Sequence, residues 1–263
     1  ELNRAWPDTA SMDALSFTLN PQVHATDERS LVEALETQTY MILTAKAHCG
    51  PQPICVSSVT LKPPFNQAAT EEETPDPNKL PPSVDQRQMS LFAAAWTVGS
   101  IGALTAGGAS SVTFYETIGW RGLLETNQGS PMPDKFRSMP GMVFPVYYVF
   151  ADLADVKDAK CYATESSDPL SVQGLALRGK KGWRVLVANL TPSAQRVAVG
   201  PFPAGLASIR RMNDVTVHQA MKDPATFGDF REFVSLSDGA FELDLEPYET
   251  VRLDIEMNQD PSS

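Results

Sequence analysis

Residues 109–122, ASSVTFYETIGWRG, carry the pattern that decides the predicted fold. Within them, the β-branched and aromatic residues from Ser111 to Tyr115 predict a short strand, and the apolar run ends at Glu116. The Ala-rich segment Met89–Thr105 before it predicts a helix that stops at a glycine pair. A helix, a glycine stop, a buried strand and a carboxylate at the strand end form the repeating unit of a (β/α) barrel, in which chemistry takes place where the strands end.

Two more strands and a helix are predicted before this unit. Ala14–Leu19 predicts an apolar strand, and Asp27 is placed to cap a helix from Glu28 to about Ala47. Ile54–Leu61 predicts the next strand, and its β-branched residues are typical of a buried parallel strand. Residues 62–85 then form a Pro-rich, acidic loop, for which a lid over the strand ends and a disordered insertion are two open hypotheses.

The hydrophobic pattern of the sequence changes beyond about residue 157, from βα units to short alternating segments. After an expected helix at Phe144–Leu153, short alternating segments separated by turns predict antiparallel strands: Ser171–Leu177, Trp183–Leu190, Arg196–Val199, Ala240–Leu245 and Thr250–Ile255. We therefore expect an α/β chain in which residues 1–156 form the last units of a (β/α)8 TIM-type barrel that carry the site. Residues 157–263 are expected to form a C-terminal antiparallel β-sandwich. Because a closed barrel of this type has eight strands, the missing ones are expected from an upstream barrel half, in the same protein or in a second chain.

The composition of the chain excludes some classes of partner and cofactor from the expected function. The chain has 263 residues and a formal net charge of −11, with a pI near 4.7, so its surface repels phosphate backbones and no nucleic-acid partner is expected. No apolar run approaches the roughly 20 residues of a membrane span, so no membrane partner is expected either. The three cysteines lack a C-x-x-C spacing and the three histidines lie far apart. This pattern predicts reduced thiols in a cytoplasmic protein, with neither a metal site nor a cofactor.

Polar residues collect at the predicted strand ends and form a candidate site. Glu116 is the first catalytic candidate and His24 is the second, with Glu1 at the end of an earlier strand as the third. Carboxylates, amides, guanidinium groups and an indole are the groups that bind sugar hydroxyls and stack on sugar rings. The expected substrate-binding residues are Asn3, Arg4, Asn20, Gln22, Trp120 and Arg121.

A purely structural role is an open alternative for several of these residues. Glu116 would then only pair with Arg121 and hold its loop. His24 would bond loop backbone, and Trp120 would be a packing residue.

The sequence resembles D-apionate lactonases over most of residues 1–190. The blocks that carry the resemblance are ELNR, NPQVHATDERSLVEALETQ, VSSVTLKPPFN, QMSLFAAAWTVGS, SVTFYETIGWRG, PGMVFPVYYVFADLAD and SSDPLSVQGLAL. The resemblance implies an enzyme that opens the lactone of the branched sugar acid apionate in carbohydrate catabolism. It also implies a glycoside-hydrolase-like barrel followed by a β-sandwich. Relative to the family, the N-terminal half is expected to lie outside residues 1–263.

Three functions from different classes are compatible with these residues. A lactonase that converts D-apionolactone, a small sugar-acid lactone, to D-apionate needs a base, for which we expect Glu116, and oxyanion donors, for which we expect Arg4, Asn20 or Arg121. A glycoside hydrolase needs two carboxylates, for which Glu1 and Glu116 are the candidates. The non-enzyme alternative is a carbohydrate-binding or assembly fragment.

Overall fold

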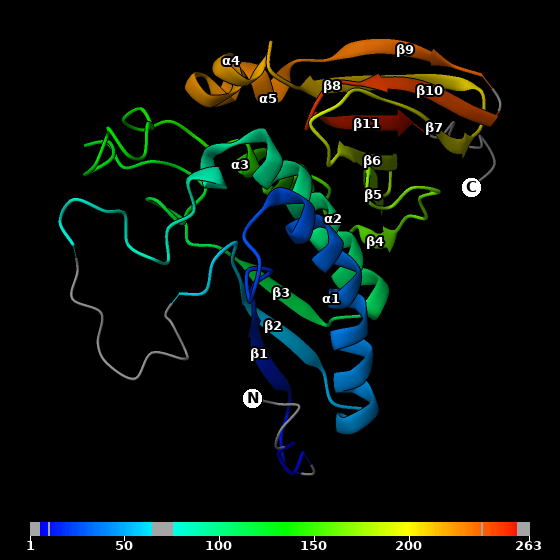
Figure 1. Cartoon of the computed structure of the whole chain (residues 1–263). Coiled ribbons are helices and arrows are strands. Elements are labelled where there is room, and N and C mark those ends of the chain that lie inside the picture. The colour runs from blue at the N-terminus through cyan, green and yellow to red at the C-terminus, as the bar shows by residue number, and fades with distance from the viewer. Residues whose placement is uncertain (1–5, 10, 65–75, 238, 257–263) are drawn as a thin grey trace.

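The computed structural model describes residues 6–9, 11–64, 76–237 and 239–256 (Figure 1). The described part of the chain contains a three-stranded parallel sheet, a six-stranded sheet and a two-stranded sheet. The parallel sheet comes first in the sequence and the other two follow it. This order agrees with the predicted change from βα units to antiparallel strands.

The parallel sheet consists of β1 (Leu15–Leu19), β2 (Ile54–Val59) and β3 (Ser111–Phe114), paired in that order. Two helices follow its first two strands, α1 (Glu28–Cys49) and α2 (Leu91–Gly107), and they lie side by side in Figure 1. The predicted βα units are therefore confirmed. Three parallel strands are described where a closed barrel has eight, so this sheet is an open segment of a barrel.

Local chemistry explains where α1 and α2 begin and end. The Asp27 carboxylate caps α1 by accepting the Ser30 N–H at 3.0 Å, as expected from the sequence. The second helix begins later than predicted, at Leu91, because a short 3₁₀ helix, η1 (Gln86–Met89), precedes it. It ends at Gly107, and the capping residue Gly108 has a φ of +76°, the left-handed conformation that glycine adopts at little cost.

The helix α2 is buried around most of its circumference, as its apolar sequence predicts. Its Trp96 indole N–H donates to the Leu31 carbonyl of α1 at 2.9 Å. A Cβ placed on Gly99 would lie 2.8 Å from Leu35 of α1 and 3.3 Å from Gln173 of the six-stranded sheet. Glycine at position 99 thus allows α2 to approach both of its neighbours closely.

The C-terminal strands form two antiparallel sheets whose facing sides enclose a second apolar core. The six-stranded sheet has the order β4-β5-β6-β11-β8-β9, and the two-stranded sheet pairs β10 with β7. The strands are β4 (Lys160–Ala163), β5 (Val172–Arg178), β6 (Gly182–Asn189), β7 (Gln195–Phe202), β8 (Gly205–Met212), β9 (Glu232–Leu236), β10 (Gly239–Leu245) and β11 (Thr250–Glu256). The predicted sandwich is confirmed.

Several elements were not predicted from the sequence. They are β4, β8, β9, η1 and two short helices, α4 (Val217–Lys222) and α5 (Pro224–Asp229). The strand β8 carries Arg210 at a buried position, which obscures its alternation. The predicted helix near residues 144–153 is α3 (Val146–Ala154).

A buried ionic cluster joins α3 to the six-stranded sheet. Arg252 of β11 lies directly opposite Arg210 of β8, a like-charged pair that would repel. The Asp152 carboxylate of α3 accepts from Arg210 Nη2 at 2.6 Å and from Arg252 Nη1 at 2.8 Å, with all three side chains about 95% buried. Arg184 of β6 donates to the Asp152 carbonyl at 2.8 Å. One carboxylate therefore compensates two arginines and fixes α3 on the sheet.

No helix within the described ranges has the length and hydropathy needed to cross a bilayer.

Replacing Asp152 by Asn should lower the free energy of unfolding of the whole protein by about 3–5 kcal/mol, because it removes the counter-charge of the buried Arg210 and leaves Arg252 with Asp254 alone, at 3.1 Å. The matched control is Asp158→Asn, which removes a carboxylate from an exposed pair with Lys180 and should cost under about 1 kcal/mol. Urea unfolding of both variants measures the difference. Equal losses would show that the cluster contributes no more than a surface pair.

Candidate functional site at the ends of the parallel strands

The three parallel strands end at the same level. Leu19 is paired with Val59, and Val59 is paired with Phe114. The Thr60 N–H donates to the Leu19 carbonyl at 3.1 Å, and the N–H of the residue after Phe114 donates to the Val59 carbonyl at 3.0 Å. The residues that follow the strands therefore share one edge of the sheet, as the sequence analysis expected for a barrel site.

Glu116 lies in a turn directly after β3, and the buried side chain of the preceding residue holds this turn in place. Tyr115 before it has a φ of +49°, uncommon for a non-glycine residue, and directs the chain away from the strand. The Tyr115 side chain is buried, and its hydroxyl shares a hydrogen bond of 2.8 Å with the Thr97 hydroxyl of α2. Burial in this apolar setting raises the pKa of the Tyr115 phenol well above its usual value, so the phenol stays neutral.

Two interactions close the turn after Glu116. The Glu116 N–H donates to the Arg121 carbonyl at 2.9 Å, and the Arg121 guanidinium donates to the Glu116 carboxylate. The Glu116 side chain is still 49% exposed and the Arg121 side chain 29% exposed. The ion pair that the sequence suggested is present, and its carboxylate is open to solvent.

A second polar group lies at the ends of β1 and β2. The buried Gln22 amide donates to the Leu61 carbonyl and to Asp85 Oδ2, both at 2.6 Å. Arg87 also donates to Asp85, through Nε at 2.9 Å and Nη2 at 2.7 Å. Burial opposes ionisation of Asp85, but the hydrogen bonds from Arg87 and Gln22 outweigh it and hold the pKa of the carboxyl below its usual value. Gln22 Oε1 is buried without a hydrogen-bond partner among the described residues.

A hollow of about 440 Å³ adjoins this group. Lys62 and Gln22 line it, and its wall continues into residues 80–87 at the C-terminal side of the Pro-rich loop. The Lys62 ammonium donates to the Val84 carbonyl at 3.2 Å and brings a positive charge to the hollow. Residues 65–75 lie outside the described residues, so the lid hypothesis for residues 62–85 stays a prediction.

The other predicted site residues differ in exposure and in their contacts. His24 is exposed. Asn20 is half-buried, and its Oδ1 has no hydrogen-bond partner in the described structure. The Trp120 indole N–H donates to the Ser130 hydroxyl at 2.9 Å, and its ring lies 6.3 Å from that of Phe136, which are the contacts of a packing residue. Glu1, Asn3 and Arg4 lie outside the described residues.

Three buried polar residues of this region were not predicted from the sequence. Asp85 is one of them, and its position before a short helical run is the signal that could have found it. Gln88 donates to the Gly122 carbonyl at 2.9 Å and holds the loop after Glu116. Glu125 is 1% exposed and accepts from the Thr126 N–H at 2.7 Å and from the Ser138 hydroxyl. Neither Gln88 nor Glu125 carries a sequence signal, because loop contacts bury them.

Among the described residues, no group of three or more His, Cys, Asp or Glu side chains is arranged to hold a metal ion.

The parallel βα segment and the antiparallel sandwich that follows it have counterparts in several solved structures. Similar solved structures include an α-L-arabinofuranosidase from Thermotoga maritima, with a TM-score of 0.59, 12% identity and coverage of 93% of this chain and 53% of that one. The bifunctional glucanase-xylanase CelM2 from a metagenome library has a TM-score of 0.56, 12% identity and coverage of 94% and 44%. A 4-O-α-L-rhamnosyl-β-D-glucuronidase from Fusarium oxysporum has a TM-score of 0.55, 14% identity and coverage of 92% and 53%. The chain thus spans about half the length of these proteins, and the likeness concerns the fold.

Family models identify the chain more closely. Residues 1–158 match the TIM barrel domain of D-apionate lactonase, and residues 169–253 match the C-terminal immunoglobulin-like domain of D-apionate lactonase. The chain belongs to the D-apionate lactonase family, whose name is that of a hydrolase. No curated protein sequence matches the chain.

Replacing Asp85 by Asn should lower the free energy of unfolding at neutral pH by about 1–3 kcal/mol, because its bonds to Arg87 lose their charged acceptor. A carboxyl whose pKa is lowered in the folded state stabilises the protein above its unfolded pKa of about 3.9 and loses that effect as the pH falls through the folded value. The deficit of the variant should therefore shrink below about pH 4.

The matched control for this test is Asp76→Asn, at an exposed carboxylate that pairs with Lys79 at 3.4 Å. Urea unfolding between pH 7 and pH 3 compares the two variants with the wild type. A deficit of Asp85→Asn that is no larger than that of the control, or that stays constant with pH, would contradict the assigned role.

Proposed function

We propose that the whole protein that contains this chain hydrolyses a sugar-acid lactone, with D-apionolactone as the substrate and D-apionate as the product. Membership of the D-apionate lactonase family supports the reaction class. The observation that carries the proposal is the partly exposed Glu116 carboxylate. It pairs with Arg121 at the edge of the sheet where the parallel strands end.

In the proposed reaction, a water molecule attacks the lactone carbonyl carbon and Glu116 accepts one of its protons as general base. A carbon–oxygen bond to water forms, and the carbonyl oxygen becomes an oxyanion in the tetrahedral intermediate. The ring carbon–oxygen bond then breaks, and the departing alkoxide takes the proton back from Glu116. The products are a hydroxyl group and a carboxylic acid, which ionises at neutral pH.

Oxyanion stabilisation in this scheme comes from Arg121 and Asn20. The Arg121 guanidinium is already oriented by Glu116, and preorganised donors of this kind lower the barrier to acyl transfer. Asn20 follows β1 at the same edge, and its amide N–H₂ would donate to the oxyanion. His24 is the alternative base, because it is exposed close to the end of the same strand.

The second candidate is glycoside hydrolysis, for which the same half-exposed Glu116 would serve as one of two carboxylates. Retaining enzymes place the two about 5–5.5 Å apart and inverting enzymes about 6.5–9.5 Å apart. The proposed partner is Glu1, which lies outside the described residues. The third candidate is a carbohydrate-binding or assembly fragment without catalysis.

The test replaces Glu116 by Gln in the whole protein and follows acid release from D-apionolactone at constant pH. Removal of a general base typically costs about 10²–10⁴-fold in rate, so we expect a loss of at least 10²-fold in kcat. The fold should survive with a change of at most about 1 kcal/mol, because the Glu116–Arg121 pair is partly exposed.

Glu242→Gln is the matched control, since Glu242 pairs with Arg196 on the sandwich at 2.6 Å and is likewise exposed. It should retain wild-type turnover. Near-wild-type turnover of Glu116→Gln would remove Glu116 from the mechanism and leave His24→Gln as the next test. Wild-type protein that cleaves aryl glycosides but not lactones would support glycoside hydrolysis instead, and inactivity on both substrate classes would support a binding fragment.

A further inference from the structure

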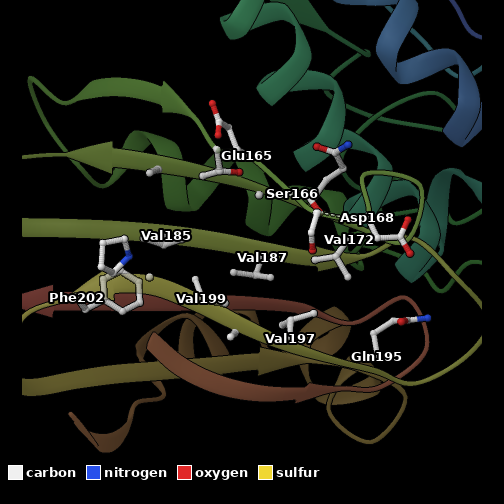
Figure 2. A pocket seen from close by; sticks show the side chains of 18 of the residues that line it. Glu165, Ser166, Asp168, Val172, Val185, Val187, Gln195, Val197, Val199 and Phe202 are labelled. Atoms are coloured by element: carbon white, nitrogen blue, oxygen red, sulfur yellow. Dashed lines mark hydrogen bonds between the residues drawn. The ribbon is translucent and has the colours of Figure 1, made fainter. Parts of the chain in front are cut away.

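The C-terminal sandwich contains a hollow of about 700 Å³ between its two sheets. Its floor is formed by alternate residues of β5 and β6, which share one face of the six-stranded sheet. Val185 and Val187 of β6 face Val197 and Val199 of β7 across it (Figure 2). The hollow therefore lies where a sandwich normally has its apolar core.

The opposite wall is the edge of a strand. Every residue from Gln195 to Pro203 lines the hollow, including outward-facing Arg196 and Ala198 as well as inward-facing Val197. Successive side chains of a strand point to opposite faces of its sheet, so a cavity that touches all of them adjoins the strand's backbone edge. The other edge of β7 is paired with β10, and no further described strand pairs with β7.

The exposure of the inward-facing side chains of the two-stranded sheet also indicates an incomplete sheet. Leu243 and Leu245 of β10 are only 3% and 1% exposed. Val197 of β7, the partner of Leu243, remains half-exposed, and so do Val199 of β7 and its partner Phe241 of β10, although all three point to the same core. The core is thus incomplete along β7 and under the adjoining Phe241 of β10, as expected for a sheet that lacks its next strand.

The hollow is suited to a β-strand rather than to a sugar. Val185 and Val187 make its floor aliphatic, and the polar residues that Figure 2 labels include Glu165 and Asp168 of the loop before β5 and Gln195 at the start of β7. A sugar site needs polar groups that converge on the ligand. A free strand edge needs a row of backbone donors and acceptors, which only another extended chain supplies.

We propose that this hollow is the seat of a β-strand from the part of the whole protein outside residues 1–263. The strand pairs with the free edge of β7 and inserts alternate aliphatic side chains over Val185 and Val187. Two findings favour this occupant over a second copy of the chain. The chain spans about half the length of proteins with the same fold, and its barrel domain, with three parallel strands described, needs further strands from the same source. The rest of the protein would then complete both halves of this chain.

Hydrogen–deuterium exchange on the unmodified whole protein tests whether the edge is covered. The amides of β7 should exchange as slowly as those of the central strand β6, because both edges of β7 are then paired. The internal control is β9, which is the outer strand of the six-stranded sheet and should exchange at least tenfold faster. Amides of β7 that exchange as fast as those of β9 would overturn the proposal.

Photo-crosslinking identifies the occupant. A benzophenone amino acid replaces Val199 in the whole protein, and the control carries it at Phe233, which is 67% exposed on β9. Mass spectrometry should find crosslinks from position 199 to a peptide outside residues 1–263 in protein of monomer mass, and not from position 233. Crosslinks confined to residues 1–263, a product of dimer mass, or no crosslink above the control would each overturn it.

Discussion

The rest of the structure depends on the burial of α2. This helix touches α1 on one side and the six-stranded sheet on the other, so one element supplies apolar surface to both halves of the chain. Close approach on both sides requires a residue without a side chain at Gly99. Because an apolar helix of this kind cannot face water, the barrel segment and the sheet are held together around it.

The strand-end edge follows from this arrangement. The Tyr115 hydroxyl is bonded to Thr97 on α2, so the buried helix fixes the point at which β3 ends and Glu116 begins. The loop after Glu116 is held in turn by Gln88, which lies just before α2. The proposed catalytic carboxylate is therefore positioned by the core and remains open to solvent, a combination that favours a reactive group on a rigid support.

The hydrophobic pattern of the sequence could not predict which charged residues are buried. Asp152 and Arg210 are charged residues that become buried because partners distant in sequence compensate them, and Asp85 is buried between its near neighbour Arg87 and the distant amide of Gln22. Hydrophobic periodicity treats every charge as exposed, so it misses β8, where Arg210 lies at an inward position. The ion pair between Arg210 and Asp152 compensates the buried charges, and it joins residues 58 positions apart. A pattern of neighbouring residues cannot predict a contact over that separation.

The amino-acid sequence by itself determined the order of βα units and antiparallel strands, the cap at Asp27, the glycine stop of α2 and the strand-end placement of Glu116. Each of these depends on propensity, periodicity or capping over a few neighbouring residues. Tertiary structure alone decided that the three strands end at one level, that Gln22 meets Asp85 and that the edge of β7 borders a hollow. These features depend on contacts between segments far apart in the chain, whose geometry is set only when the core packs.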